Sequence, residues 1–462
     1  MPDIILVRII DKPMGVFKRV GANQHPMNLV YLASWLSQQG HLSEIIDLEV
    51  EAFEYLEKKL KLAFPYLVGI TAMTPNIPDI KPIVKICAGL GVKTVLGGAH
   101  PTALPAQTLK DTACDFVVMG EGEMPLSELL GNIKNNISPD SIPGLAFMRN
   151  GAAVINKLPA LLDIDKLPLP DRRFLKLDKY KGKATPAVPA PAATIFTSRG
   201  CPYTCTFCAS KIINQQQIRF RSMEKVFAEI DDIIGLGFKH LNVEDDCFTL
   251  NQQRVEEFCA YLINKYPNLS WDCDCRVDAV NERILGMMKR SNCKKISFGV
   301  ESGSPRILKV INKGIDVEQV KHAFRLTKQY GILTQGLFMV GFPEESAQDI
   351  QATEKLIDEL KPDLLQLANV VPFPGTALYD EMTEKGFLTQ ADWGSFHFFN
   401  DEINWQIRYF SGQDLSRIRR KISRKFYFRL SWLLKRILSV RNLSDLSYLV
   451  KGGLVAWKAF GK

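Results

Sequence analysis

Three cysteines stand within eight residues of one another, in the segment Ser198-Arg-Gly-Cys-Pro-Tyr-Thr-Cys-Thr-Phe-Cys208. The spacing of Cys201, Cys205 and Cys208 is Cys-x3-Cys-x2-Cys. Three thiolates on one short loop can each bind one iron of a cubane iron–sulfur cluster, which leaves the fourth iron without a protein ligand. Such an iron can bind a substrate, so the spacing predicts a catalytic cluster rather than an electron-transfer centre.

A zinc site or a disulfide framework fits these cysteines less well. A structural zinc ion requires a fourth Cys or His at regular spacing, and Cys273 and Cys275, in or just after a predicted buried strand, are the nearest candidates. Ten cysteines in 462 residues are also too sparse for a disulfide framework. We therefore expect an iron–sulfur cluster at this loop.

The cysteine loop follows the first strand of a predicted β/α series. Strand patterns occur at 193–197, 240–244, 269–273, 295–301, 333–340 and 364–370. Helical patterns separate them at 222–236, 253–265, 281–290, 317–330 and 346–360. Six such units predict a partial (β/α)6 barrel, in which chemistry takes place at the carboxyl ends of the strands.

A second α/β unit precedes the barrel. Strand patterns at 4–9, 43–48, 67–71, 94–97 and 115–119 alternate with helical stretches, which predicts a doubly wound, Rossmann-like parallel sheet. Residues 141–191 are rich in proline and lack periodicity, so we expect a connector there. The predicted domains are 1–140, the linker 141–191, the barrel 192–375, and a C-terminal lid with a basic amphipathic helix at 376–462.

The cysteine spacing, with Phe207 before the last cysteine, resembles the signature of the radical S-adenosylmethionine (radical SAM) family. The resemblance implies a [4Fe-4S] cluster that cleaves S-adenosylmethionine to a 5′-deoxyadenosyl radical. It also implies that residues at later strand ends bind this cofactor. These are one of Glu244, Asp245 and Asp246 for the methionine amine, Arg276 for the methionine carboxylate, and Glu301 and Ser302 for the ribose and carboxylate.

The first unit resembles the cobalamin-binding domain that precedes the barrel in one radical SAM subclass. The resemblance rests on Leu29-Val-Tyr-Leu-Ala33, Gly97-Gly-Ala-His-Pro-Thr102 and Gly120-Glu-Gly-Glu123, and it implies that Thr71, Gly97 and Gly98 contact cobalamin. The Asp-x-His-x-x-Gly motif that supplies an axial histidine to cobalt is absent, and Asp11-Lys-Pro-Met-Gly15 stands at its place. His25 and His100 are the nearby histidines, and a domain that has lost its cofactor is the alternative.

The resemblance implies cobalamin-dependent methylation of an unactivated carbon, or alternatively an oxidation, cyclisation or rearrangement like that of the anaerobic porphyrin cyclase. An electron-transfer protein is disfavoured by the open iron. An RNA-modifying methylthiotransferase is disfavoured because Cys87 and Cys114 do not form a second set of three cysteines. We expect an external electron donor such as flavodoxin or ferredoxin. An aromatic cluster of Trp393, Phe396, His397 and Phe398 suits an apolar or ring-containing small-molecule substrate, although ordinary core aromatics account for it equally well.

The net charge of +8 is concentrated in the tail. From Arg417 to Lys462 there are thirteen Lys or Arg and one acid, a charge of +12, so the remainder carries −4. No nucleic-acid partner is therefore expected for the body of the protein. The sequence has no signal-peptide pattern and no long apolar run, which predicts a cytoplasmic protein.

The tail itself carries Ile418, Ile422, Phe426, Leu430, Leu434 and Leu438 at intervals of four, the pattern of a basic amphipathic helix. A helix docked on the barrel is the leading interpretation. Contact with a membrane surface, or with an acidic partner or RNA, is the alternative.

Overall fold

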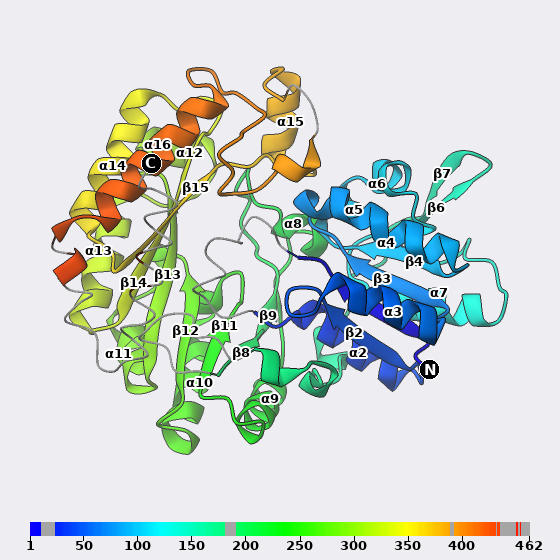
Figure 1. Ribbon diagram of the computed structural model, residues 1–462. Coiled ribbons are helices and arrows are strands. Elements are labelled where there is room, and N and C mark those ends of the chain that lie inside the picture. Colours follow the sequence, from blue (N-terminus) through cyan, green and yellow to red (C-terminus); the bar gives the residue numbers. More distant parts are fainter. Residues whose placement is uncertain are drawn as a thin grey trace.

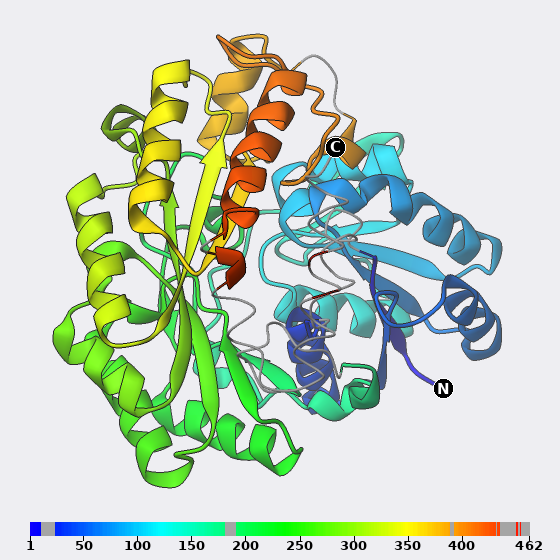
Figure 2. The same cartoon turned by 60° about the vertical axis from the view of Figure 1, so that its left-hand side comes forward.

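The computed structural model describes residues 1–10, 24–180, 191–388, 392–430, 432–434, 450 and 453, which form two α/β lobes side by side (Figures 1 and 2). The N-terminal sheet has the order β2-β1-β3-β4-β5-β6-β7, and its first five strands are parallel. These five are β1 (Ile4–Arg8), β2 (Ser43–Asp47), β3 (Leu67–Thr71), β4 (Lys93–Gly97) and β5 (Phe116–Val118).

Helices cover both faces of this sheet, which is why its strands are continuous apolar runs. One face packs against α2 (Met27–Gln38) and α7 (Glu123–Lys134). The other packs against α3 (Phe53–Ala63), α4 (Ile77–Gly89) and α6 (Pro105–Thr112), while the short α5 (Ala99–Ala103) follows β4. The predicted doubly wound fold is confirmed.

The first sheet extends further along the chain than predicted. Strands β6 (Leu145–Arg149) and β7 (Ala152–Ile155) form a hairpin that pairs antiparallel with β5, so the segment assigned to the linker from residue 141 begins inside this domain. The turn is Asn150-Gly151, and both residues have positive φ, 49° and 81°. Asn-Gly is a strong hairpin signal, because both central residues of the favoured two-residue turn need positive φ.

The second lobe is a six-stranded, all-parallel sheet in the order β15-β14-β13-β12-β11-β8, which confirms the partial barrel. Its strands are β8 (Ala192–Ile195), β11 (His240–Val243), β12 (Ser270–Cys275), β13 (Cys293–Glu301), β14 (Leu333–Val340) and β15 (Leu364–Asn369). The connecting helices are α9 (Met223–Gly235), α10 (Gln252–Lys265), α11 (Glu282–Arg290), α12 (Pro305–Val310), α13 (Val317–Gln329) and α14 (Ala347–Leu360). The carboxyl ends of the strands therefore meet at one edge.

The C-terminal part packs on the barrel. Helix α15 (Ala377–Glu384) leads to α16 (Gly412–Tyr427), which lies along the outer side of the barrel in Figure 2. Ile422 and Phe426 are buried in the barrel core, and Lys425 pairs with Glu354 and Asp358 of α14 at 2.6 and 2.7 Å. This agrees with the docked-helix interpretation up to Tyr427. Leu438 lies outside the described residues.

The predicted aromatic lid is mostly core. Trp393 and Phe396 are buried, and the Trp393 ring lies 4.9 Å from that of His100 in α5, so this segment fastens the C-terminal part to the first domain. Phe398 is the exception, because it remains 39% exposed and faces a cavity described below. Among the described residues, no helix is both long and apolar enough to cross a bilayer.

Candidate functional site

The cysteine loop begins where β8 ends, at the carboxyl edge of the barrel. Cys205 is buried and Cys201 and Cys208 are half-buried, and all three thiols are free. No three His, Cys, Asp or Glu side chains in the described part of the chain are arranged to hold a single metal ion. A cubane cluster imposes a different geometry from such a site, because each thiolate binds a separate iron.

Burial raises the pKa of the Cys208 thiol to about 11 and also raises that of Cys201. Iron binding removes this obstacle, since a thiolate bound to a metal is deprotonated outright. Lys313 lies on the same side of the barrel, with its ammonium 5.9 Å from the ring centroid of Phe207 in the loop. Three thiols on one loop, with a buried cation beside it, fit an iron–sulfur cluster.

Asp245 fixes the entrance to the cysteine loop. It is 3% exposed and accepts hydrogen bonds from the backbone nitrogens of Thr197 and Ser198, at 2.6 and 3.2 Å, and from both of their hydroxyls, at 2.5 and 2.8 Å. Four donors occupy its carboxylate, and it lines neither cavity described below. Asp245, one of the three acids predicted for the methionine amine, is therefore occupied by the loop, and its role is to hold the loop in place.

Arg276, which follows β12, contacts the same loop. Its guanidinium stacks on Tyr203 with the central carbon 3.6 Å from the ring centroid, and its Nε and Nη2 donate to Asp278 at 3.0 and 2.9 Å. The side chain is 6% exposed. The structure thus places the predicted Arg276 against the residues between Cys201 and Cys205, with its planar fork oriented by a carboxylate.

Glu301 ends β13 in an unusual backbone conformation, with φ of 67°. Its carboxylate accepts from the ammonium of Lys313 at 2.7 Å, and both side chains are about nine-tenths buried. Gly299 leaves the space for this pair, because an added Cβ would lie 2.8 Å from Glu301 Oε1 and 3.0 Å from Lys313 Nζ. Lys313 was missed at the level of sequence, since a lone lysine after a short helix carries no local signal.

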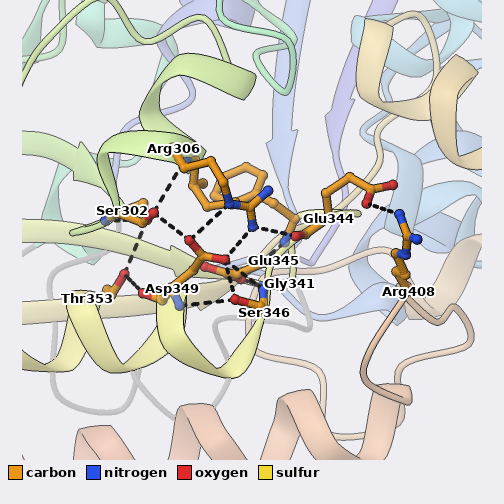
Figure 3. A network of polar contacts seen from close by, with 12 residues as sticks. Ser302, Arg306, Gly341, Glu344, Glu345, Ser346, Asp349, Thr353 and Arg408 are labelled. Atoms are coloured by element: carbon orange, nitrogen blue, oxygen red, sulfur yellow. Dashed lines mark hydrogen bonds and ion pairs between the residues drawn. The ribbon is translucent and has the colours of Figure 1, made fainter.

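Ser302, the neighbour of Glu301, faces the other way. Its hydroxyl shares a hydrogen bond of 3.2 Å with Thr353 of α14, which in turn donates to the backbone oxygen of Asp349 at 3.1 Å in the polar network of Figure 3. It lines neither cavity. Ser302 therefore points away from the side on which the cofactor contact was predicted, because successive residues at the bend that ends β13 point to opposite sides.

A cavity of about 430 Å³ lies between the two lobes. Thr71, Gly97 and Gly98 line it from the first domain, and Glu244 and Asp246 line it from the barrel, so five predicted residues meet there. Gly98 has φ of 117°, and a Cβ at this position would lie 2.7 Å from the carbonyl oxygen of Ala72. The glycine cradle lets a ligand approach the backbone closely, which fits a large cofactor bound across strand ends.

The two acids at the end of β11 differ in environment. Burial, together with the nearby carboxylates of Asp274 and Asp272, raises the pKa of Glu244 to about 7. Its carboxylate accepts from Gln24 Nε2 at 3.0 Å, while Asp246 accepts from the Ser210 hydroxyl at 2.7 Å. Asp246 and Glu244, unlike Asp245, thus remain open to the cavity.

Neither nearby histidine lines this cavity. His25 is packed edge-on against Tyr180 and Phe238, and burial lowers its pKa to about 4. His100 is packed against Trp393, with its Nδ1 3.2 Å from the Thr74 hydroxyl. Residues 11–15, where an axial histidine motif would stand, lie outside the described residues.

A second cavity, of about 300 Å³, lies beside the cysteine loop. Cys208 and Glu301 form part of its wall, and most of the rest is apolar, including Phe207, Phe373 and Phe398. Met73 and Ala99 line both cavities, so the two spaces adjoin at the loops that follow β3 and β4. Only the fold brings these residues to one place, and no local pattern indicated their shared position.

Family models match both parts of the chain. The model described as B12 binding domain matches residues 14–130, and the model described as Radical SAM superfamily matches residues 195–357.

Relatives match along most of the chain. A protein of Pyrococcus horikoshii named as an uncharacterized methyltransferase is 33% identical over 441 residues, which cover 94% of this chain and 94% of the relative. An anaerobic magnesium-protoporphyrin IX monomethyl ester cyclase of Rubrivivax gelatinosus is 29% identical over 385 residues, covering 79% of this chain and 68% of that protein.

Among solved structures, the cobalamin-dependent S-adenosylmethionine radical enzyme OxsB, with aqua-cobalamin and S-adenosylmethionine bound, matches with a TM-score of 0.78. The identity is 18%, and the match covers 100% of this chain and 72% of OxsB. At this identity the likeness concerns the fold.

Proposed function

The chain belongs to the radical SAM family, in the group whose members carry a B12-binding domain ahead of the barrel, and we propose that it methylates an unactivated carbon of a small-molecule substrate. When bound, the [4Fe-4S] cluster and cobalamin supply an electron for the cleavage of S-adenosylmethionine and a carrier for a methyl group. An unactivated carbon is too poor a nucleophile for ordinary methyl transfer, which is why a radical is required.

One observation carries the proposal: the cavity between the lobes and the cavity beside the cysteine loop meet at Met73 and Ala99. Methyl transfer between cofactors and substrate requires reacting atoms about 3–3.5 Å apart. Adjoining cavities would let a substrate approach both cofactors without a long-range domain movement.

The residues divide between the two cofactors. We assign Cys201, Cys205 and Cys208 to the cluster, and Thr71, Gly97 and Gly98 to cobalamin. Glu244 or Asp246 would accept from the methionine amine, because a carboxylate forms a charge-assisted hydrogen bond with an ammonium group. Arg276 would meet the methionine carboxylate, and Glu301 the ribose.

The surroundings of the reaction follow from the same assignment. The apolar wall of the second cavity suits an apolar or ring-containing substrate. An external one-electron donor such as flavodoxin or ferredoxin would reduce the cluster, and the protein would work in the cytoplasm. Contact of the basic tail with an anionic membrane surface is a secondary proposal, supported by exposed Phe428, Leu430 and Leu434 among basic residues.

A cobalamin-dependent oxidation or cyclisation is the second candidate function. It is favoured by the relative from Rubrivivax gelatinosus named as a cyclase, which covers less of this chain at lower identity than the methyltransferase-named relative does. The two reactions differ in their by-products, because methylation consumes the methyl group of S-adenosylmethionine and cyclisation does not.

The test is anaerobic reconstitution with iron, sulfide and hydroxocobalamin, followed by reductant and S-adenosylmethionine. We expect 5′-deoxyadenosine and S-adenosylhomocysteine from the wild type, and no 5′-deoxyadenosine from a Cys201→Ala, Cys205→Ala, Cys208→Ala variant. Cys87→Ala, which removes a buried thiol of the first domain, is the matched control and should retain both products. Formation of 5′-deoxyadenosine without S-adenosylhomocysteine would favour the cyclase-type reaction.

A further inference from the structure

Two acids of the first domain bind the arginine that precedes the cysteine loop. Arg199 stands two residues before Cys201, and its Nη1 and Nη2 donate to Glu121 and Glu123, each at 2.8 Å. Glu121 lies in the loop after β5, and Glu123 is the first residue of α7. The contact therefore joins the two lobes at the base of the cysteine loop.

The contact is reinforced from the neighbouring strand. Arg199 lies in β9 (Ser198–Arg199), which pairs antiparallel with β10 (Arg219–Phe220), and Arg199 and Arg219 are register partners. Arg219 donates to the two oxygens of Glu121 at 2.7 and 3.0 Å. Glu121 thus holds both strands of the ribbon from which the cysteine loop emerges.

The ion pairs are largely buried, so each charged side chain needs its partner to compensate its charge. The exposed fractions of the Glu121, Glu123 and Arg199 side chains are 9%, 5% and 21%. Removing one partner from such a set leaves an uncompensated charge in a poorly solvated place. Any shift of the acids must therefore be followed by the ribbon.

The ribbon in turn directs the cysteine loop. Gly200 has φ of 89°, and a Cβ there would collide with the carbonyl oxygen of Gln217. The chain passes this point in close contact with α8 (Ser210–Asn214) and with the segment between α8 and β10. The path into Cys201 is consequently set by the ribbon.

The same acids form the wall of the cavity between the lobes. Glu121, Glu123 and Arg199 all line it. A ligand that fills this cavity would contact the groups that hold the ribbon. A single cluster of ion pairs therefore connects the wall of the cavity with the start of the cysteine loop.

We propose that Glu121, Glu123 and Arg199 couple the two cofactor sites, so that a corrinoid in the cavity and a cluster on the loop strengthen each other's binding. Arg199 acts as a positioning residue in this scheme. The inference rests on the proposed function for the identity of the two groups and goes beyond it in assigning their thermodynamic linkage. Linkage is reciprocal, so each group must raise the affinity of the other by the same factor.

The experiment measures the Kd of hydroxocobalamin by absorbance, anaerobically, for the cluster-free protein and for the cluster-reconstituted protein. We expect binding about 5-fold or more tighter with the cluster in place, the lower end of typical coupling. In Arg199→Leu and in Glu121→Gln, Glu123→Gln the ratio should fall towards one. Arg199→Lys keeps the charge but not the two-pronged geometry, so it should retain part of the gain in hydroxocobalamin affinity that the cluster causes.

A second readout is the rate at which an iron chelator removes the cluster. Added hydroxocobalamin should slow this loss in the wild type and should not slow it in Arg199→Leu. Asp111→Ala is the matched control, because it removes another contact of the first domain with the C-terminal part, the 2.9 Å bond from Trp393 Nε1, away from both acids. It should keep the wild-type ratio.

The outcomes distinguish failure of the coupling from failure of the proposed function. The coupling is overturned if the Kd of hydroxocobalamin is the same with and without the cluster in the wild type. It is also overturned if Arg199→Leu, with native circular dichroism, keeps the wild-type ratio of the two Kd values. Either result leaves the proposed function intact. Loss of the ratio in Asp111→Ala as well would show a general effect of domain contact and also overturn the coupling. Absence of hydroxocobalamin binding in cluster-loaded wild type would refute both.

Discussion

The guanidinium of Arg276 lies 3.6 Å from the ring centroid of Tyr203, so the residue that follows β12 is stacked on the loop that carries the three cysteines. The stack joins the proposed S-adenosylmethionine site to the cluster site. A cation over an aromatic ring contributes about 0.5–2 kcal/mol, depending on its desolvation. Here the larger consequence is orientation, because Tyr203 packs on one face of the guanidinium and Asp278 accepts two hydrogen bonds at its edge.

Replacement of Arg276 tests this role. Arg276→Met should reduce 5′-deoxyadenosine formation by at least about 10-fold, the equivalent of about 1.4 kcal/mol, while iron content stays near wild type. Arg276→Lys should recover little, since an ammonium group cannot reproduce the stacked, two-pronged geometry. Arg283→Met, at an exposed pair with Glu256, is the control. Equal activity of Arg276→Met and wild type would contradict the assignment.

Asp245 is expected to matter for cluster assembly rather than for catalysis. Asp245→Ala leaves two backbone N–H groups and two hydroxyls without an acceptor, which should cost about 1–3 kcal/mol and lower the iron content after reconstitution. Asp245→Asn should be milder, because the hydroxyls can rotate to accept from the amide. Iron analysis and thermal unfolding measure both effects. Asp246→Ala should retain the iron, and retention of iron by Asp245→Ala would count against the anchoring role.

Replacement of Gly98 tests whether cobalamin approaches the backbone closely at this glycine. Gly98→Ala combines a φ of 117° with a Cβ 2.7 Å from Ala72, so we expect weaker hydroxocobalamin binding and a loss of about 1–3 kcal/mol of stability. Gly91 has φ of 68° and open space around it, so Gly91→Ala isolates the backbone strain alone. If both variants bind hydroxocobalamin equally well, close approach at Gly98 is unimportant.

Glu345 predicts a pH dependence of stability. Its side chain is fully buried in the network of Figure 3, where Oε2 accepts from Gly341 N at 2.6 Å, and burial raises its pKa to about 7 from 4.5. Between these values the unfolded chain loses the proton and the folded chain keeps it. Stability therefore falls as pH rises from about 4.5 to 7, and is constant outside this window as far as Glu345 contributes.

Glu345→Gln should remove this contribution, because a neutral amide can still accept from Gly341. We expect the fall in unfolding temperature between pH 5 and pH 8 to be smaller in the variant than in the wild type, both without cluster. The difference corresponds to about 1–3 kcal/mol. Glu344→Gln, which removes the more exposed pair with Arg408 and Lys385, is the control. If the unfolding temperature of Glu345→Gln fell more steeply with pH than that of the wild type, the prediction would be contradicted.

Met73 tests the junction of the two cavities. It is 52% exposed and lines both of them, so Met73→Trp should narrow the junction. We expect S-adenosylhomocysteine formation to fall by about 10-fold or more, while 5′-deoxyadenosine formation stays within about 2-fold, because only transfer between the sites is obstructed. Met124→Trp, at an exposed position of α7, should change neither product. A parallel loss of both products would place Met73 in the cleavage site itself.

Much of the fold was readable because its signals are local. Strands β3 and β14 match the predicted strands residue for residue, since a short segment rich in apolar and β-branched residues is a local strand signal. The β6–β7 hairpin was missed because its proline-rich neighbours suggested a connector, although Asn150-Gly151 is a hairpin signal. The hairpin moves the end of the first domain from the predicted residue 140 to at least residue 155.

The chemistry of the cysteine loop follows from the amino-acid sequence alone. Ligand type and spacing along eight residues decide how many irons the loop can hold, and no distant part of the chain alters that. The strand pattern also placed Thr71, Gly98 and Glu244 at strand ends, because it defines where each strand stops.

Which strand-end residues face a ligand depends instead on the tertiary structure. Asp245 turned to the loop and Ser302 to α14, while Met73, Glu121, Lys313 and Arg199 gained roles that no local pattern indicates. The physical reason is that a side chain's partners come from segments far apart in the chain, as Glu121 and Arg199 do across 78 residues. Burial, charge pairing and cavity walls exist only once those segments have packed together.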